Sequence, residues 1–204
     1  LDPLIDGITK SLISFKNNVN CISSFPAFAF FSEDKDVHND TRIDSRLAWC
    51  TGDLGVIYSL LYNSKILDEH AHLEGLIYRL LGKVLVRGTS DSGLDHFVEY
   101  SFFDTSFCHG ISGILFMLLK INQKVKDEYL SKRIEYWEEE LLKNFRIQLV
   151  KLGDDIYLPW NKQDENNSYI LDKESMLNGI CGVGLVLLSL HYKKYDWSDF
   201  FLLY

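Results

Sequence analysis

The stretch FCHGISGILFMLL, residues 107–119, joins a thiol, an imidazole and two glycines to a long apolar run. The same x-x-G-x-x-G pattern, again followed by an apolar run, occurs in CTGDLGVIYSLL (residues 50–61) and in LNGICGVGLVLL (residues 177–188). Self-similarity at intervals of several tens of residues is the signature of a repeat architecture. The sequence therefore predicts three copies of one structural unit.

Each apolar run carries few charges and little polar–apolar alternation, which indicates a helix buried on most of its circumference. We call these the inner helices. The segments between them place apolar residues on one stripe and charges opposite, as outer helices do. The stripe residues are Leu73, Leu76, Ile77, Leu80, Leu81 and Val84 in one segment and Ile134, Trp137 and Leu141 in the other. Alternating inner and outer helices predict an all-α fold of helical hairpins arranged side by side, in a solenoid or an α/α ring.

The paired glycines are expected to let helices and loops approach closely, since glycine has no side chain. A phosphate-binding role is excluded because no Lys-Ser or Lys-Thr follows any pair and no strand pattern precedes one. Cys181, inside the third pair, is expected to be a small core residue.

The 204 residues, 47% of them hydrophobic, suffice for one well-formed core. Four scattered cysteines favour a reducing compartment rather than a disulfide framework. The apolar runs are much shorter than the roughly 20 residues of a membrane span, and no signal-peptide pattern opens the chain. We therefore expect a cytoplasmic protein. The net charge of −8 argues against a nucleic-acid partner.

Cys50 and Cys108 occupy the same position in two of the repeats, and His109 follows Cys108. If equivalent helices are neighbours, these three side chains converge at one end of the fold. Two thiolates and an imidazole suit zinc and leave its fourth position open, as in catalytic sites. The third repeat has Leu177 and Asn178 there, so it adds no usual ligand. The alternative is that each cysteine is an ordinary core residue.

His96 and Asp104 precede the Cys-His pair. They could supply a proton or orient His109, although ordinary loop positions are the expectation we favour.

The order R-x-x-x-W-C-x-G-x-x-G, C-H-G-x-x-G, a glycine-paired apolar helix and a terminal W-x-x-x-x-L-L resembles the lanthionine synthetase C-like (LanC-like) family. The segments that carry this resemblance are Arg46 with Trp49 to Gly52, Cys108 to Gly110, Gly179 to Leu188, and Trp197 with Leu202 and Leu203. It extends from about Arg46 to the C-terminus.

The resemblance implies an α/α toroid and a zinc-dependent cyclase that acts on ribosomally made peptides in lanthipeptide (lantibiotic) biosynthesis. Such an enzyme adds a cysteine thiol to dehydroalanine or dehydrobutyrine and forms lanthionine or methyllanthionine. The resemblance also implies that Cys50, Cys108 and His109 bind zinc, with the substrate cysteine in the fourth position. Arg46 matches an active-site arginine of the family and would stabilise the developing enolate.

The chain departs from the family pattern in several places. The G-x-x-H-G-x-x-G motif and the active-site aspartate expected before the W-C-x-G segment are absent, and Thr51 replaces a frequent tyrosine. A full toroid also needs about twice as many hairpins. Residues 1–204 are therefore interpreted as one toroid segment, the C-terminal half of a LanC-like domain.

A half-ring needs an N-terminal half or a second copy of itself to cover its inner helices, and a dehydratase is a further expected partner. Alone, the segment should bind zinc and catalyse weakly, because no general acid is evident. Two alternatives stay open: a degenerate helical-repeat domain that only binds peptide, and a related enzyme that adds glutathione to dehydroamino acids.

Overall fold

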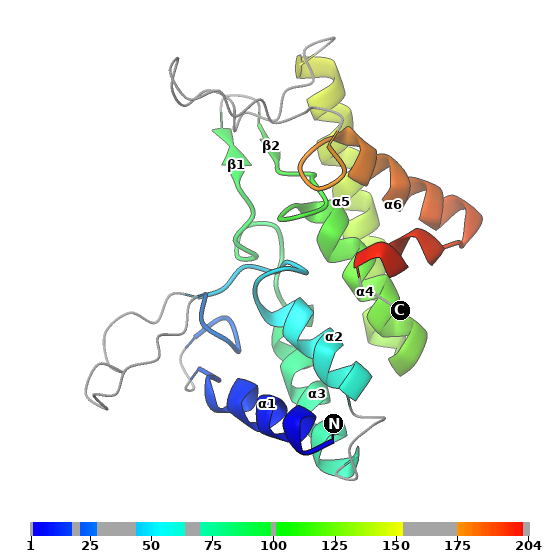
Figure 1. Cartoon of the computed structure of the whole chain (residues 1–204). Coiled ribbons are helices and arrows are strands. Elements are labelled where there is room, and N and C mark those ends of the chain that lie inside the picture. Colours follow the sequence, from blue (N-terminus) through cyan, green and yellow to red (C-terminus); the bar gives the residue numbers. More distant parts are fainter. Residues whose placement is uncertain are drawn as a thin grey trace, which may run out of the picture. The chain divides into compact units, whose positions relative to one another are not determined.

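A computed structural model describes residues 2–17, 21–27, 44–63, 70–98, 101–152 and 175–201. The chain forms two compact units, Leu1–Gly93 and Leu94–Tyr204 (Figure 1). Leu202 and Leu203, which contribute to the family resemblance, lie outside the described residues. No helix within the described ranges is both long enough and apolar enough to cross a membrane.

In the described part of the first unit, the helices are α1 (Asp2–Ser14), α2 (Asp53–Asn63) and α3 (His70–Leu85). Helices α2 and α3 pack side by side as a hairpin (Figure 1). The apolar stripe predicted between Leu73 and Val84 is buried, so α3 is the amphipathic partner of the hairpin.

The second unit begins with a short antiparallel pair of strands, β1 (His96–Phe97) and β2 (Phe102–Phe103). Its helices are α4 (Ile111–Val125), α5 (Glu128–Leu152), α6 (Ile180–Tyr192) and the 3-10 helix η4 (Asp196–Phe201). Helix α4 packs against both α5 and α6 (Figure 1). The predicted α5 stripe is buried, with Trp137 only 1% exposed. An aromatic cluster is formed by the rings of Phe107, Phe116 and Trp197. Through Trp197, η4 packs against this core.

The predicted all-α class is confirmed, because helices make up most of the described residues and the strands form one two-stranded pair. The three inner helices begin at Asp53, Ile111 and Ile180, each directly after the first glycine of its pair. The inner helices were predicted to be buried on most of their circumference. This prediction is confirmed for α4, whose residues from Ile111 to Leu118 are all buried.

Helix α6 differs from that expectation. Its Cys181, Leu188 and Tyr192 are exposed, so the prediction that Cys181 is a core residue is wrong. The reason is its place on the helix: Gly182, Val183 and Val186 take the buried face, and Cys181 points away from it.

The second glycine of each pair has the same packing role in all three repeats. A Cβ atom there would overlap a backbone carbonyl oxygen six residues earlier, at distances that real Cβ atoms do not show. The glycine and carbonyl partners are Gly55 with Trp49, Gly113 with Phe107, and Gly182 with Met176. The glycines are thus needed because the preceding loop crosses directly over the first turn of each helix.

Candidate metal site

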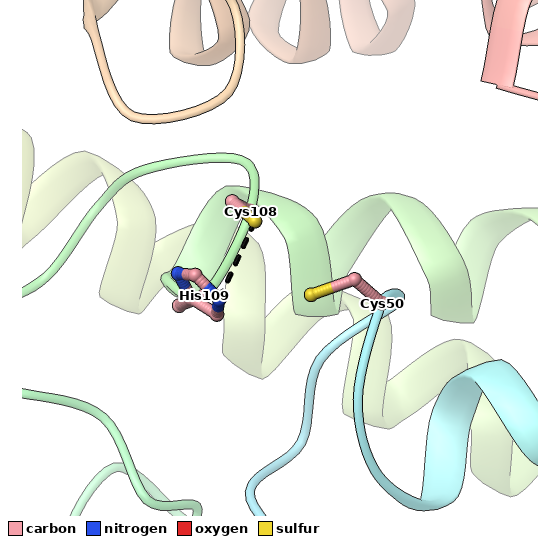
Figure 2. Close-up of side chains that lie close together, drawn as sticks. All are labelled: Cys50, Cys108 and His109. Atoms are coloured by element: carbon pink, nitrogen blue, oxygen red, sulfur yellow. Dashed lines mark hydrogen bonds between the residues drawn. The ribbon is translucent and has the colours of Figure 1, made fainter.

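Cys108 and His109 lie in a short loop, residues 104–110, that leads into α4; we call it the Cys-His loop. Cys108 is 9% exposed and His109 is half-buried. The Cys108 Sγ lies 3.4 Å from the His109 Nε2 (Figure 2). Adjacent residues therefore present a sulfur and a ring nitrogen to the same point at the start of the helix.

Buried hydrogen bonds fix the backbone of the Cys-His loop. The Asp104 carboxylate accepts bonds from the Ser106 N–H at 2.8 Å and from the Ser106 hydroxyl at 2.9 Å. The Asp104 carbonyl accepts from the Ile111 N–H at 2.9 Å, and the Ser112 hydroxyl donates to the Thr105 carbonyl at 2.7 Å. The loop is held by its own residues, by the first turn of α4 and by Gln148 of α5, whose side-chain oxygen accepts a buried hydrogen bond from the Thr105 hydroxyl.

Burial raises the pKa of Asp104 above its ordinary value, although the two bonds from Ser106 act in the opposite direction. Both bonds join Asp104 to Ser106, so this carboxylate helps to hold the backbone of the loop that carries Cys108 and His109. His96 is exposed and its ring stacks on Phe103 at a centroid distance of 4.4 Å.

The third repeat borders the Cys-His loop within the same unit. The Cys108 N–H donates to the Leu177 carbonyl at 2.8 Å. A Cβ atom on Gly182 would lie 2.7 Å from the Cβ of Phe107. For these two repeats, the expectation that equivalent glycine ends are neighbours is confirmed.

Cys50 lies in the corresponding loop of the first unit, residues 45–53, which leads into α2 (Figure 2); we call it the Cys50 loop. Cys50 is exposed, in contrast to Cys108. Gly52 has a φ of 107°, whereas Gly110 and Gly179 of the other repeats have extended backbones. The same motif thus has a different backbone conformation before α2 than before α4 and α6.

Arg46 is half-buried and its backbone is enclosed by two glycines with positive φ. A Cβ atom on Gly93 would lie 2.6 Å from the Arg46 Cβ, and one on Gly52 would overlap the Arg46 carbonyl. The next residue, Leu47, donates its N–H to the Ser92 carbonyl at 2.8 Å. The position of Arg46 therefore depends on the turn that ends in Gly93.

A buried ion pair lies at the end of the Cys50 loop. The Asp53 Oδ2 is 3.5 Å from the Arg87 Nη1, and the two side chains are 0% and 2% exposed. Asp53 also accepts the N–H groups of Ser24 and Phe25 at 2.9–3.0 Å. Burial raises the pKa of Asp53 and lowers that of Arg87, against the attraction between the two charges. Neither residue was predicted from the sequence, in which the only signal was the position of Asp53 at the start of a repeat helix.

The donor groups fit zinc. Ligand bonds of about 2.3 Å to sulfur and about 2.05 Å to nitrogen at a tetrahedral angle place the two ligand atoms about 3.6 Å apart. The 3.4 Å between Cys108 Sγ and His109 Nε2 agrees with that separation. Cys50, in the first unit, is a further residue of a type that binds zinc.

A family model described as "Lanthionine synthetase C-like protein" matches residues 4–203. The chain belongs to the lanthionine synthetase C-like family. The match begins well before Arg46, so the resemblance covers the first unit as well. LanC-like proteins are α/α toroids associated with zinc and act on peptide substrates. No curated protein sequence matches the chain.

Proposed function

We propose that this LanC-like chain is the zinc-binding part of a lanthionine and methyllanthionine cyclase. It would activate a cysteine thiol of a dehydrated lanthipeptide precursor for addition to dehydroalanine or dehydrobutyrine. The observation that carries this function is the Cys108–His109 pair, whose sulfur and nitrogen have the separation expected of two ligands of one zinc ion.

Cys50, Cys108 and His109 are the three ligands. Support for Cys50 comes from its place in the repeat, which is that of Cys108, and from its residue type. Leu177 and Asn178 of the third repeat offer neither thiol nor imidazole, so the fourth position stays open for the peptide sulfur. Zinc bound there would lower the pKa of the substrate thiol, so that the nucleophilic thiolate is present at neutral pH.

In the reaction, a bond forms between the peptide sulfur and the β-carbon of the dehydroamino acid. The electron pair of the carbon–carbon double bond moves towards the neighbouring carbonyl, and a proton at the α-carbon completes the thioether. Arg46 is assigned to the carbonyl oxygen, where a guanidinium stabilises the developing negative charge by charge-assisted hydrogen bonds. Its enclosed backbone supports that assignment, because charge stabilisation depends on a fixed donor.

The proton donor for the α-carbon is not assigned to this chain. No G-x-x-H-G-x-x-G motif occurs in the sequence, and Asp104 is buried with its carboxylate bonded to Ser106. We therefore expect zinc binding with slow cyclisation by the chain alone, and faster cyclisation when a LanC-like N-terminal half, which carries the histidine, is added.

Zinc content per purified chain tests the site. The chain and its Cys181→Ala variant should each contain about one zinc ion, and Cys108→Ala should lose it. Cys181 is the matched control because it is also a cysteine of the second unit, but lies on the exposed face of α6. A zinc-free chain, or equal loss from both variants, would contradict the proposed site.

A dehydrated peptide with one cysteine, followed by mass spectrometry after thiol alkylation, then tests the chemistry. Ring closure protects the thiol from alkylation. If ring closure is no faster with zinc-loaded protein than without it, the result would favour the peptide-binding alternative. That alternative is supported by the absent histidine motif. Added glutathione in the same assay distinguishes the third candidate, since its addition raises the peptide mass.

A further inference from the structure

One guanidinium group connects both ends of the Cys50 loop. The Arg87 Nη2 donates to the carbonyl of Ser45 at 2.8 Å, where the loop begins. The Arg87 Nη1 lies 3.5 Å from the Asp53 carboxylate, where the loop ends. Arg46 and Cys50 lie between these two points in the sequence. The ends of the segment that carries both residues are thereby tied to one side chain.

The same guanidinium also reaches the turn that encloses Arg46. The Arg87 Nε donates to the Asp91 carbonyl at 3.0 Å. The neighbouring Ser92 carbonyl accepts the N–H of Leu47, and Gly93 packs on Arg46 itself. Arg87 therefore joins the loop to the turn against which Arg46 rests.

The contacts of Arg87 with Ser45 and Asp53 are shielded from solvent. The side chains of Arg87 and Asp53 are 2% and 0% exposed, and Ser45 is also buried. Water cannot easily replace a lost partner there, and salt screens buried charges only weakly. A change at Arg87 should therefore move the loop rather than be absorbed by solvent.

We propose that Arg87 is a positioning residue for Arg46 and Cys50. It sets the distance between the two ends of the Cys50 loop. In this way it determines the positions of the Cys50 thiolate and the Arg46 guanidinium. For metal binding, this role rests on the proposed function. Outer groups that orient ligands in this way change metal affinity by roughly ten- to a hundred-fold when they are removed.

Arg87→Lys is the most informative variant. Lysine keeps a positive charge beside Asp53, but a single ammonium group cannot reproduce the planar fork that reaches Ser45 and Asp91 at once. Leu76→Ala is the matched control, because Leu76 is a buried residue of α3 in the same unit and is 4% exposed. Its loss lowers stability through packing and leaves the three polar contacts of Arg87 unchanged.

Two measurements compare these variants with the unchanged chain. Competition with a chelator gives the zinc affinity, and the absorption bands of the cobalt-substituted protein report how the thiolate ligands are arranged. In the metal-free protein, the alkylation rate of Cys50, resolved by peptide mass spectrometry, reports the position of its loop. We expect Arg87→Lys to lose roughly ten-fold or more in affinity, with shifted cobalt bands and an altered Cys50 alkylation rate.

Unchanged affinity, cobalt bands and alkylation rate in Arg87→Lys would overturn the positioning role. Changes of equal size in Leu76→Ala would also overturn it, because they would trace to stability alone. If Arg87→Lys does not fold, Asp53→Asn provides the same test from the other end of the contact. Absence of zinc from the unchanged chain would contradict the proposed function, while the alkylation rate of Cys50 would still decide whether Arg87 positions the loop.

Discussion

The Cys50 loop and the Cys-His loop follow the same sequence pattern but are held in different ways. Most bonds that hold the Cys-His loop lie within it or reach the first turn of α4 and the nearby Asp95, and two more distant groups, Gln148 and Leu177, add neutral bonds to Thr105 and Cys108. The Cys50 loop is held by groups 28 to 42 residues away in the sequence, at Ser24, Phe25 and Arg87. A shared motif thus specifies the entry into a helix without specifying what anchors it.

The two anchors also differ in chemistry. A charged pair fixes the Cys50 loop, and its formation requires the removal of two ions from water. In the Cys-His loop, one buried carboxylate bonds to an N–H and a hydroxyl, and neutral hydrogen bonds supply the rest. Removal of a single partner should therefore have a larger effect in the first loop than in the second.

The largest effect is expected from Asp53→Ala. Loss of this carboxylate leaves the Arg87 guanidinium buried without its counter-charge and the N–H groups of Ser24 and Phe25 without their acceptor. Breaking a buried pair in this way costs about 3–5 kcal/mol of stability. Hydrogen exchange, followed separately in α2–α3 and in α4–α5, should show faster exchange in the first unit.

Ser112→Ala is the counterpart in the Cys-His loop. It removes one neutral hydrogen bond to the Thr105 carbonyl, for which the net loss is about 1 kcal/mol, seen in α4. Equal losses from Asp53→Ala and Ser112→Ala would mean that the charged anchor contributes no more than a neutral one.

A second prediction concerns the feature that the loops share, the glycine that packs on a carbonyl. Gly182→Ala should destabilise the second unit by about 3 kcal/mol, because its Cβ would overlap the Met176 carbonyl and press on Phe107. Gly184→Ala, two residues further along α6, meets nothing within 4 Å. It should stabilise the helix by roughly 0.5–1 kcal/mol.

Thermal unfolding of the two α6 variants checks this prediction. The difference between them should carry over to the first unit, where Gly55→Ala meets the Trp49 carbonyl and Gly82→Ala on α3 meets nothing. Similar melting temperatures for Gly182→Ala and Gly184→Ala would contradict the packing role.

The sequence was informative wherever the determining contacts are local. The starts of α2, α4 and α6 follow from glycines and apolar runs, and the Cys108–His109 pair is adjacent in the chain. The contact between Asp53 and Arg87 could not be predicted, since 34 residues separate them and neither belongs to a periodic pattern. The exposure of Cys181 was missed because an apolar run does not reveal which of its faces is covered.

The smallest effect is expected for Lys120, a buried cation of the second unit that lies outside both loops. Burial lowers its pKa below the ordinary value, against the attraction of Asp199 and Asp196 on η4, and Lys124 adds a further lowering. The charged form is thus disfavoured in the folded chain. Replacement by an apolar side chain, Lys120→Met, should be neutral or stabilise the protein by about 1 kcal/mol at pH 7, in contrast to the loss expected when the Asp53–Arg87 pair is broken.

The stability change caused by Lys120→Met should depend on pH. Between the lowered folded pKa of Lys120 and the ordinary lysine value, the unfolded chain binds more protons than the folded chain, so stability rises with pH in that alkaline window. Lys120→Met removes this rise, and its advantage over the unchanged chain should therefore shrink as the pH approaches about 10.4. Urea unfolding at several pH values measures the difference. Lys132→Met on α5 is the control that should show no such trend, because Lys132 is 65% exposed and does not contribute to the lowered pKa of Lys120. A large loss of stability in Lys120→Met at pH 7 would contradict this prediction. It would mean that Lys120 stabilises the second unit as Arg87 stabilises the first, so that the two units differ only in how their loops are held.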